Sequence, residues 1–150
     1  MIKVKLREAK YKGKTVPSSV ISKTNSPVDI NLDMETPIVV YADNIEIPFV
    51  ITIRNVGGGT VCLNSEKCRK PSTEGYEWNR LRLEIKTDTD MELKNCENQM
   101  TVDIPYGREQ KISCKLVIMN RMDRIVQKKI EIMAKYGYFV EKAIKVKVVR

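Results

Sequence analysis

The stretch that decides the fold is residues 47–60, which read Ile-Pro-Phe-Val-Ile-Thr-Ile-Arg-Asn-Val-Gly-Gly-Gly-Thr. Phe49, Ile51 and Ile53 recur at every second position. This period of two predicts a strand with one buried face. The run ends at Asn55, and three glycines follow at positions 57–59. Glycine adopts positive φ without steric cost, so the sequence predicts a sharp turn directly after the strand.

The same rhythm of alternating strand and polar turn occurs elsewhere in the chain. We expect further strands at residues 2–6, 30–34, 81–85, 91–96, 102–104, 112–118, 126–138 and 143–149, and short extended pieces at 38–41 and 61–63. The composition of residues 126–134 also permits a helix, but the period of two favours a strand. Short strands with regular turns predict an all-β fold, an immunoglobulin-like antiparallel β-sandwich of about 7–9 strands. Residues 1–26 are expected to form an N-terminal strand or arm, and residues 27–150 the sandwich, within a single domain.

Composition limits the classes of function. The chain has 150 residues, and 27 Lys and Arg against 19 Asp and Glu give a net charge of +8 without histidine. Such an excess permits binding to nucleic acid or anionic lipid. It also matches the charged, Lys- and Glu-rich surfaces of hyperthermophile proteins, which we favour because the lysines alternate with apolar residues along strands. The basic N-terminus lacks the apolar run of a signal peptide, so any leader or anchor would lie outside this sequence.

Three pieces of the chain resemble immunoglobulin-like domains of prokaryotic, notably archaeal, cell-surface proteins, the CARDB-like family. These pieces are Asn55-Val-Gly57 after the central strand, Ile104-Pro-Tyr-Gly107 before Gln110-Lys-Ile-Ser, and Tyr136-Gly-Tyr138 before a final Ile-Lys-Val-Lys-Val strand. The resemblance spans residues 27–150. It implies a domain outside a membrane that contributes structure, adhesion or assembly without catalysis.

The four cysteines are at positions 62, 68, 96 and 114. Their spacings differ from the short knuckles of structural zinc sites, and no histidine is present. Cys114 is in phase with the apolar residues of its strand, and Cys62 and Cys68 flank a short polar loop. We favour disulfides Cys62–Cys68 and Cys96–Cys114. Crossed pairings and four free thiols remain alternatives. Disulfides would favour an oxidising, extracytoplasmic setting, intracellular hyperthermophile proteins being an exception.

Motifs for catalysis, metals or cofactors are not found. The glycine triplet is followed by neither Gly-Lys-Ser/Thr nor a GxGxxG pattern, so a tight turn is the better interpretation. Without histidine, a serine or cysteine nucleophile lacks its usual base. Asp88 and Asp90 are expected in a solvated turn because the remaining ligands of a calcium loop are missing. We therefore expect no enzyme, no cofactor and no metal site.

Aromatic and basic residues mix at one place, Lys67, Arg69, Lys70, Tyr76 and Trp78. Such a cluster can stack bases or sugars. The alternative, which we favour, is that Trp78 opens the next strand and caps the core. In either case residues 64–78 are the expected partner contact.

Together these features predict a non-catalytic extracytoplasmic structural or protein-binding module of an archaeal-type cell-surface or membrane-anchored protein. A protein partner, from the cell envelope or a second copy, is expected. The alternative is a basic intracellular nucleic-acid-binding domain, and a third hypothesis is weak carbohydrate binding through Trp78.

Overall fold

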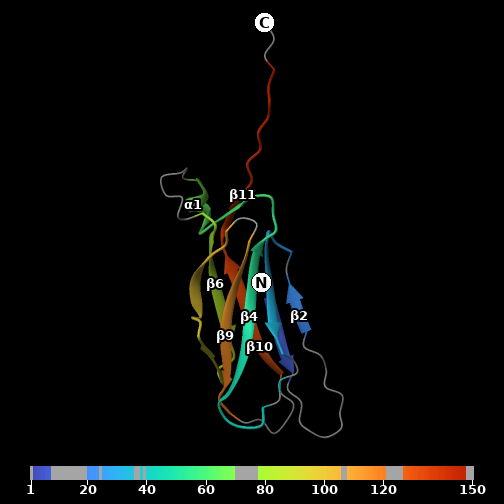
Figure 1. Cartoon of the computed structure of the whole chain (residues 1–150), viewed down its shortest axis with the longest axis vertical. Helices are drawn as coiled ribbons and strands as arrows, with labels where there is room; N and C mark the ends of the chain where they lie inside the picture. Colours follow the sequence, from blue (N-terminus) through green and yellow to red (C-terminus); the bar gives the residue numbers. More distant parts are fainter. Residues whose placement is uncertain are drawn as a thin grey trace.

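The protein is an antiparallel β-sandwich in which two sheets pack face to face (Figure 1). The computed structural model describes residues 2–7, 20–23, 25–35, 38, 40–69, 78–105, 108–120 and 127–147. Within them lie eleven strands and one short helix. The predicted all-β sandwich is thus confirmed. The strands outnumber the seven to nine expected for two reasons. The N-terminal arm contains a second strand, β2 (Val20–Lys23), and the strand expected at 126–138 divides into β10 (Gln127–Lys135) and β11 (Gly137–Phe139).

Each sheet brings together segments that are distant in the sequence. The five-stranded sheet has the order β2 (Val20–Lys23), β1 (Ile2–Arg7), β10 (Gln127–Lys135), β6 (Arg80–Thr87) and β8 (Gln99–Asp103). The four-stranded sheet has the order β3 (Val28–Met34), β4 (Ile45–Asn55), β9 (Glu109–Ile118) and β7 (Met91–Lys94). A two-stranded ribbon joins β5 (Thr60–Cys62) to β11 (Gly137–Phe139).

The strand order follows immunoglobulin sandwiches, which place strands A, B, E and D in one sheet and C, F and G in the other. The order β3, β4, β9, β7 corresponds to A, B, E, D, and the neighbours β10 and β6 correspond to F and C. The edge beside β10 differs. The immunoglobulin fold places its last strand there, whereas here the N-terminal strand β1 pairs with β10.

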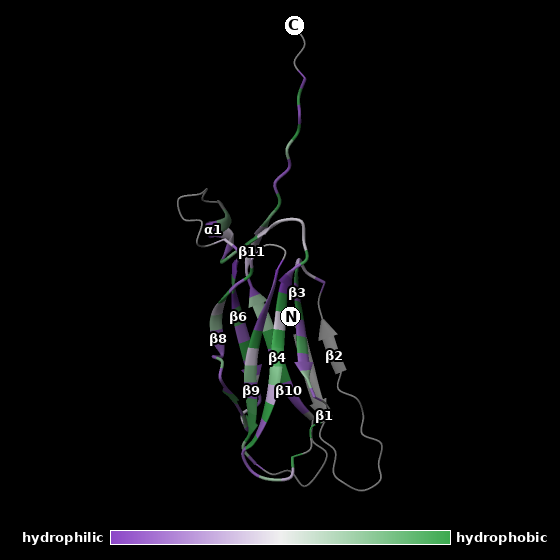
Figure 2. Ribbon diagram, viewed as in Figure 1, coloured by the Kyte–Doolittle hydropathy of each residue, from purple (hydrophilic) through white to green (hydrophobic). Residues whose placement is uncertain are grey.

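The core forms between the two sheets, where the alternating residues of β4 meet those of β6 and β10. Phe49, Ile51 and Ile53 are 2%, 0% and 0% exposed, as their alternation predicted. Ile130 and Ile132 in β10 are also fully buried. Apolar colour accordingly concentrates along β4 in Figure 2, where it runs through the middle of the sandwich. Removing these apolar side chains from water is the main source of stability.

A disulfide between Cys96 and Cys114 joins the two ends of an excursion between the sheets. Strand β7 pairs with β9 in the four-stranded sheet, but β8 crosses to pair with β6 in the other sheet. The chain then returns to the first sheet as β9, where Cys114 is buried. The bridge therefore fixes β8, which links the sheets, at both of its flanks.

Two strand predictions differ from the structure at the C-terminus. The predicted strand at 126–138 is two strands, β10 and β11, separated at Tyr136. The strand predicted at 143–149 is absent from its described part, since residues 143–147 extend away from the body without pairing to another described strand (Figure 1). The position beside β10, which the immunoglobulin fold gives to its last strand, is taken by β1, the strand expected at residues 2–6. The first 26 residues thus contribute β1 and β2 to the five-stranded sheet.

Candidate binding surface at the α1 end

One end of the sandwich carries a short helix, α1 (Ser65–Arg69), within the region expected to be a loop. Local chemistry explains the helix. The Asn64 side-chain oxygen accepts a hydrogen bond of 2.9 Å from the backbone N–H of Lys67, which is the N-cap arrangement. Glu66 places a negative charge in the first turn, where the helix dipole favours it. Five helical residues form little stable structure alone, so the helix depends on its attachments.

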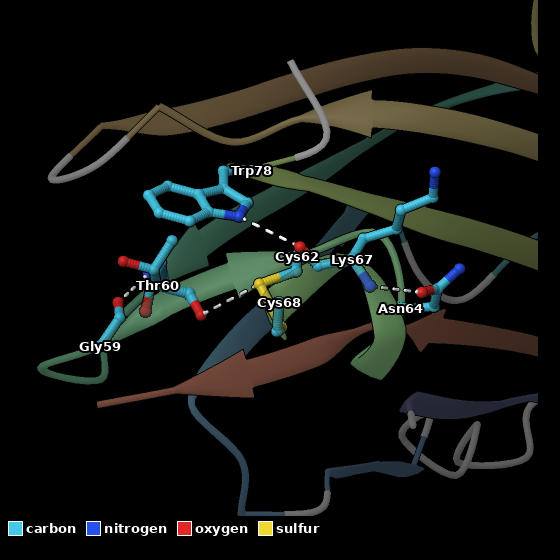
Figure 3. Close-up of a disulfide and its surroundings, with 8 residues drawn as sticks. Gly59, Thr60, Cys62, Asn64, Lys67, Cys68 and Trp78 are labelled. Carbon is cyan, nitrogen blue, oxygen red and sulfur yellow. Dashed lines mark hydrogen bonds between the residues drawn. A yellow bond between two sulfur atoms is a disulfide. The ribbon is translucent and has the colours of Figure 1, made fainter. Parts of the chain in front are cut away.

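The first attachment is the disulfide between Cys62 and Cys68, which ties α1 to β5 with the two Cα atoms 5.5 Å apart (Figure 3). This is the pairing that the sequence favoured. The second attachment is close contact with β11. A Cβ atom on Gly137 would lie 2.6 Å from the backbone of Asn64 and 2.8 Å from Cys68 Sγ. Glycine therefore allows β11 to approach the start of the helix.

Trp78 provides the third attachment. Its indole Nε1 donates a hydrogen bond of 3.2 Å to the backbone oxygen of Lys67, one of the carbonyls at the helix end (Figure 3). The ring packs against Phe139 of β11, with centroids 5.3 Å apart and planes tilted by 60°. Its backbone forms a bridge with Cys62. Trp78 is half-buried, so it supports α1 and still presents part of its surface to solvent.

The structure brings together some of the residues of the predicted contact. Lys67 and Arg69 are both in α1, and Trp78 lies against that helix. Lys70 and Tyr76 lie outside the described residues. The organised part of the predicted contact is thus α1 with Trp78, held on β5 and β11. We call α1, Trp78 and β11 the α1 end.

Two basic residues that the sequence did not single out lie beside this helix. A cavity of about 320 Å³ is lined by Leu63, Asn64, Ser65, Arg82, Lys135 and Tyr136. Arg82 and Lys135 are directly opposite each other on β6 and β10. Each occupies an ordinary polar position of an alternating strand, and only the pairing register brings them together. The cavity wall therefore combines cations with an aromatic ring, a composition suited to acidic or carbonyl groups of a partner.

Acidic residues on the sheets moderate the positive charge. The Glu84 carboxylate lies 2.8 Å from Lys135 Nζ and 3.4 Å from Lys86 Nζ. The hydrogen bond from Lys135 is the main cause that lowers the pKa of Glu84. On the other sheet, Glu46 lies 2.7 Å from Lys94 and 3.3 Å from Lys115. These hydrogen bonds, that from Lys94 first, lower the pKa of Glu46. Paired charges of this kind are spread over both sheets.

The glycine triplet forms a turn closed by Asn55 and Tyr138. The Asn55 amide donates to the carbonyl of Gly59 at 2.9 Å, and its oxygen accepts from the N–H of Gly57 at 3.1 Å. The Tyr138 hydroxyl accepts from the N–H of Gly59 at 2.6 Å. The N–H groups of Gly57 and Gly59 are thus used within the protein, as the interpretation of a tight turn predicts.

Asp88 and Asp90 have a structural role that the prediction of a solvated turn did not include. The Asp88 carboxylate accepts a 2.9 Å hydrogen bond from the backbone N–H of Lys129, and Asp90 pairs with Lys128. Both contacts fix the turn between β6 and β7 to β10. In the described part of the chain, no three Cys, Asp or Glu side chains gather in a way that could hold a metal ion.

Comparison with family models, with curated proteins and with solved structures found no match to this chain. Among the described residues, no helix has the length and apolar character needed to cross a membrane. Function must therefore be argued from the geometry of the α1 end and from the disulfides.

Proposed function

We propose that this chain is a non-catalytic structural or protein-binding module that works outside the cytoplasm, in an archaeal-type cell-surface or membrane-anchored protein. The observation that carries the proposal is the pair of disulfides. Disulfides persist in oxidising compartments and are rare elsewhere, hyperthermophiles excepted. The sequence resemblance to CARDB-like domains supports the same setting.

The α1 end is the proposed docking surface. A disulfide, a tryptophan hydrogen bond and a glycine contact hold α1 to the sandwich. Rigid attachment lowers the conformational entropy that binding must remove, so a helix held in this way is suited to recognition. Lys67 in α1 and Arg82 in the neighbouring cavity wall give the surface a positive character. The preferred partner is therefore a protein surface with exposed carboxylates.

The alternative is nucleic-acid binding, favoured by the net charge of +8. The arrangement of the charges supports a protein partner instead. Nucleic-acid sites use basic patches that follow the phosphate backbone. Here Lys94, Lys115 and Lys135 each pair with a glutamate on the sheet surface.

The experiment measures binding of the labelled, oxidised protein to envelope preparations of the cells that produce it, before and after protease treatment. We expect protease to abolish binding, and Lys67→Glu to weaken it about tenfold, the scale expected for removing one charged interaction. Lys111→Glu on β9 is the matched control, because it makes the same charge change on the four-stranded sheet and not in α1. The proposal would be refuted, and the alternative supported, if binding to the envelope preparation survives protease, if the labelled protein binds added DNA, and if this binding falls steeply with salt.

The cysteine state is tested separately. Protein isolated from its native source is unfolded without reductant, alkylated and weighed. No added label is expected if both disulfides are present, and four labels would remove the main support for an extracytoplasmic setting.

A further inference from the structure

The C-terminal segment, residues 143–147, has the properties of a strand without a partner. It reads Ala-Ile-Lys-Val-Lys, and Ile144 and Val146 are 86% and 79% exposed. In Figure 2 apolar and polar colours alternate along this segment as it leaves the body next to β11. Single exposed apolar residues are ordinary, but two on one side of an extended segment match the pattern of a strand with one buried face.

Four residues of this segment repeat a sequence that forms a strand elsewhere in this protein. Residues 2–5 and 144–147 both read Ile-Lys-Val-Lys. The first copy lies in β1 and pairs antiparallel with β10, with Ile2 opposite Ile132 and Val4 opposite Ile130. The edge of β10 can therefore pair with a strand of this sequence and accommodate its alternating apolar residues.

Beyond the residues of β10 that pair with β1, the same edge of the sheet has no described strand beside it. We call this part, residues 133–139, the open edge. Pairing between β1 and β10 ends at Ile132, and no described strand pairs with residues 133–139 on that side. On the opposite side, β6 pairs with β10 and β5 pairs with β11. The bridge between Cys62 and Trp78 places β5 next to the start of β6, so β5 is on the β6 side. The open edge carries Ala134, Tyr136 and Tyr138, which pack partly buried against the core. An exposed edge of this kind is a template for a further strand.

The residues that connect β11 to the C-terminal segment disfavour pairing of that segment with the open edge of its own chain. An antiparallel return onto the edge would make Val140, Glu141 and Lys142 a three-residue hairpin loop, with Ile144 opposite Tyr138. Such loops need a residue in the left-handed region, normally glycine or asparagine, and this loop has neither. The structure accordingly extends these residues away from the body (Figure 1). A short connection that cannot turn favours exchange of the strand with another copy.

We propose that residues 143–147 of one copy add as an antiparallel strand to the open β10–β11 edge of a second copy, which returns its own segment in the same way. Directly opposite residues of an antiparallel pair share a face. Ile144 then lies over Tyr138 and Val146 over Tyr136, while Lys145 and Lys147 face solvent. The exchange is reciprocal, so it closes as a two-fold dimer. This dimer gives a second copy as one partner for the binding role proposed above. It uses the outer edge of β10 and β11, whereas the docking proposal rests on α1 and Trp78, so either proposal can fail alone.

The test is sedimentation of the full chain from about 1 to 500 μM, together with hydrogen exchange. We expect a dimer of twice the 17.3 kDa chain mass, with slow amide exchange in residues 144–147. Ile144→Lys/Val146→Lys should raise the dissociation constant about 100-fold or more, roughly tenfold for each apolar side chain replaced. Lys145→Gln/Lys147→Gln is the matched control on the other face and should leave the dimer intact.

A hinge variant separates exchange from other dimers. Glu141→Asn/Lys142→Gly supplies the turn chemistry that the connection lacks, so the strand should close within its own chain. The expected product is a monomer whose residues 144–147 still exchange slowly. Three results would overturn the proposal: a wild-type monomer at every concentration, a wild-type dimer with fast exchange in the segment, or a dimer that Ile144→Lys/Val146→Lys leaves unchanged. Failure of the docking function at the α1 end would alter none of these measurements.

Discussion

Removing the Cys96–Cys114 disulfide should destabilise the protein by an amount that follows from the loop it closes. The two residues are 18 positions apart. On the chain-entropy relation, a closed loop of that length stabilises the folded state by about 3 kcal/mol at 25 °C. Cys96→Ala/Cys114→Ala should lower the free energy of unfolding by at least this amount, because Cys114 is also buried and its packing is weakened.

The assay is equilibrium unfolding in urea. With a slope of about 2 kcal/mol/M, the expected loss moves the midpoint down by roughly 1.5 M. Hydrogen exchange should accelerate first in β8, because the disulfide flanks the excursion of that strand between the sheets. The slope itself should rise, since the unfolded chain without the bridge exposes more surface.

The matched control is Cys62→Ala/Cys68→Ala. This bridge spans a separation of only 6, so the same relation gives about 2 kcal/mol, smaller by roughly 1 kcal/mol. Its loss should release α1 and leave β8 protected. The reasoning is wrong if removal of the longer bridge costs less than removal of the shorter one, or if both variants loosen the same strand.

Three further results are expected. Gly137→Ala should destabilise the contact between β11 and α1 by about 1–3 kcal/mol, because its Cβ would overlap the Asn64 backbone; an unchanged urea midpoint would contradict this. Asn55→Ala should cost about 1–3 kcal/mol in the same assay, since buried turn groups lose their hydrogen bonds, whereas a neutral result would mean that water replaces the amide. Glu84→Gln should flatten acid destabilisation, because the Lys135 hydrogen bond lowers the pKa of Glu84 in the folded state. The stabilisation from the ionised carboxylate is therefore present at neutral pH and is lost as the carboxylate becomes protonated in acid. Urea midpoints of the variant and the wild type that fall in parallel between pH 6 and 3 would refute it.

The buried strands could be predicted because burial imposes a period of two on their sequence. β4 and β6 each alternate apolar and polar residues, and the structure buries the apolar set. The central strand begins at Ile45, two residues before the predicted start, and it carries Pro48 in its interior. Proline is disfavoured where both neighbours need hydrogen bonds. Pairing with β3 ends at Phe49, so Pro48 has a neighbour only on the β9 side. Sequence alone does not reveal where a neighbouring strand stops.

The α1 end was harder to predict because its contacts join distant parts of the chain. Asn64 caps the helix and Glu66 lies in its first turn, but five helical residues are too few to show periodicity, so no helix was predicted here. The meeting of Arg82 with Lys135 depends on a register between strands that the sequence does not encode locally. The predicted strand at 143–149 shows the converse limit. Alternation shows that a segment suits a sheet, but not which strand or which copy of the chain pairs with it.

The α1 end and the open edge are connected through β11, and this connection bears on both proposals. β11 pairs with β5 on one side. Gly137 lies against α1, and the Tyr138 hydroxyl is held by the glycine turn. Three separate contacts therefore fix a strand of only three residues, which alone would be marginal. A fixed edge has little conformational freedom left to lose when another strand is added. The disulfide that secures α1 thus also prepares the edge for exchange, so one rigid element serves both the docking surface and the proposed dimer.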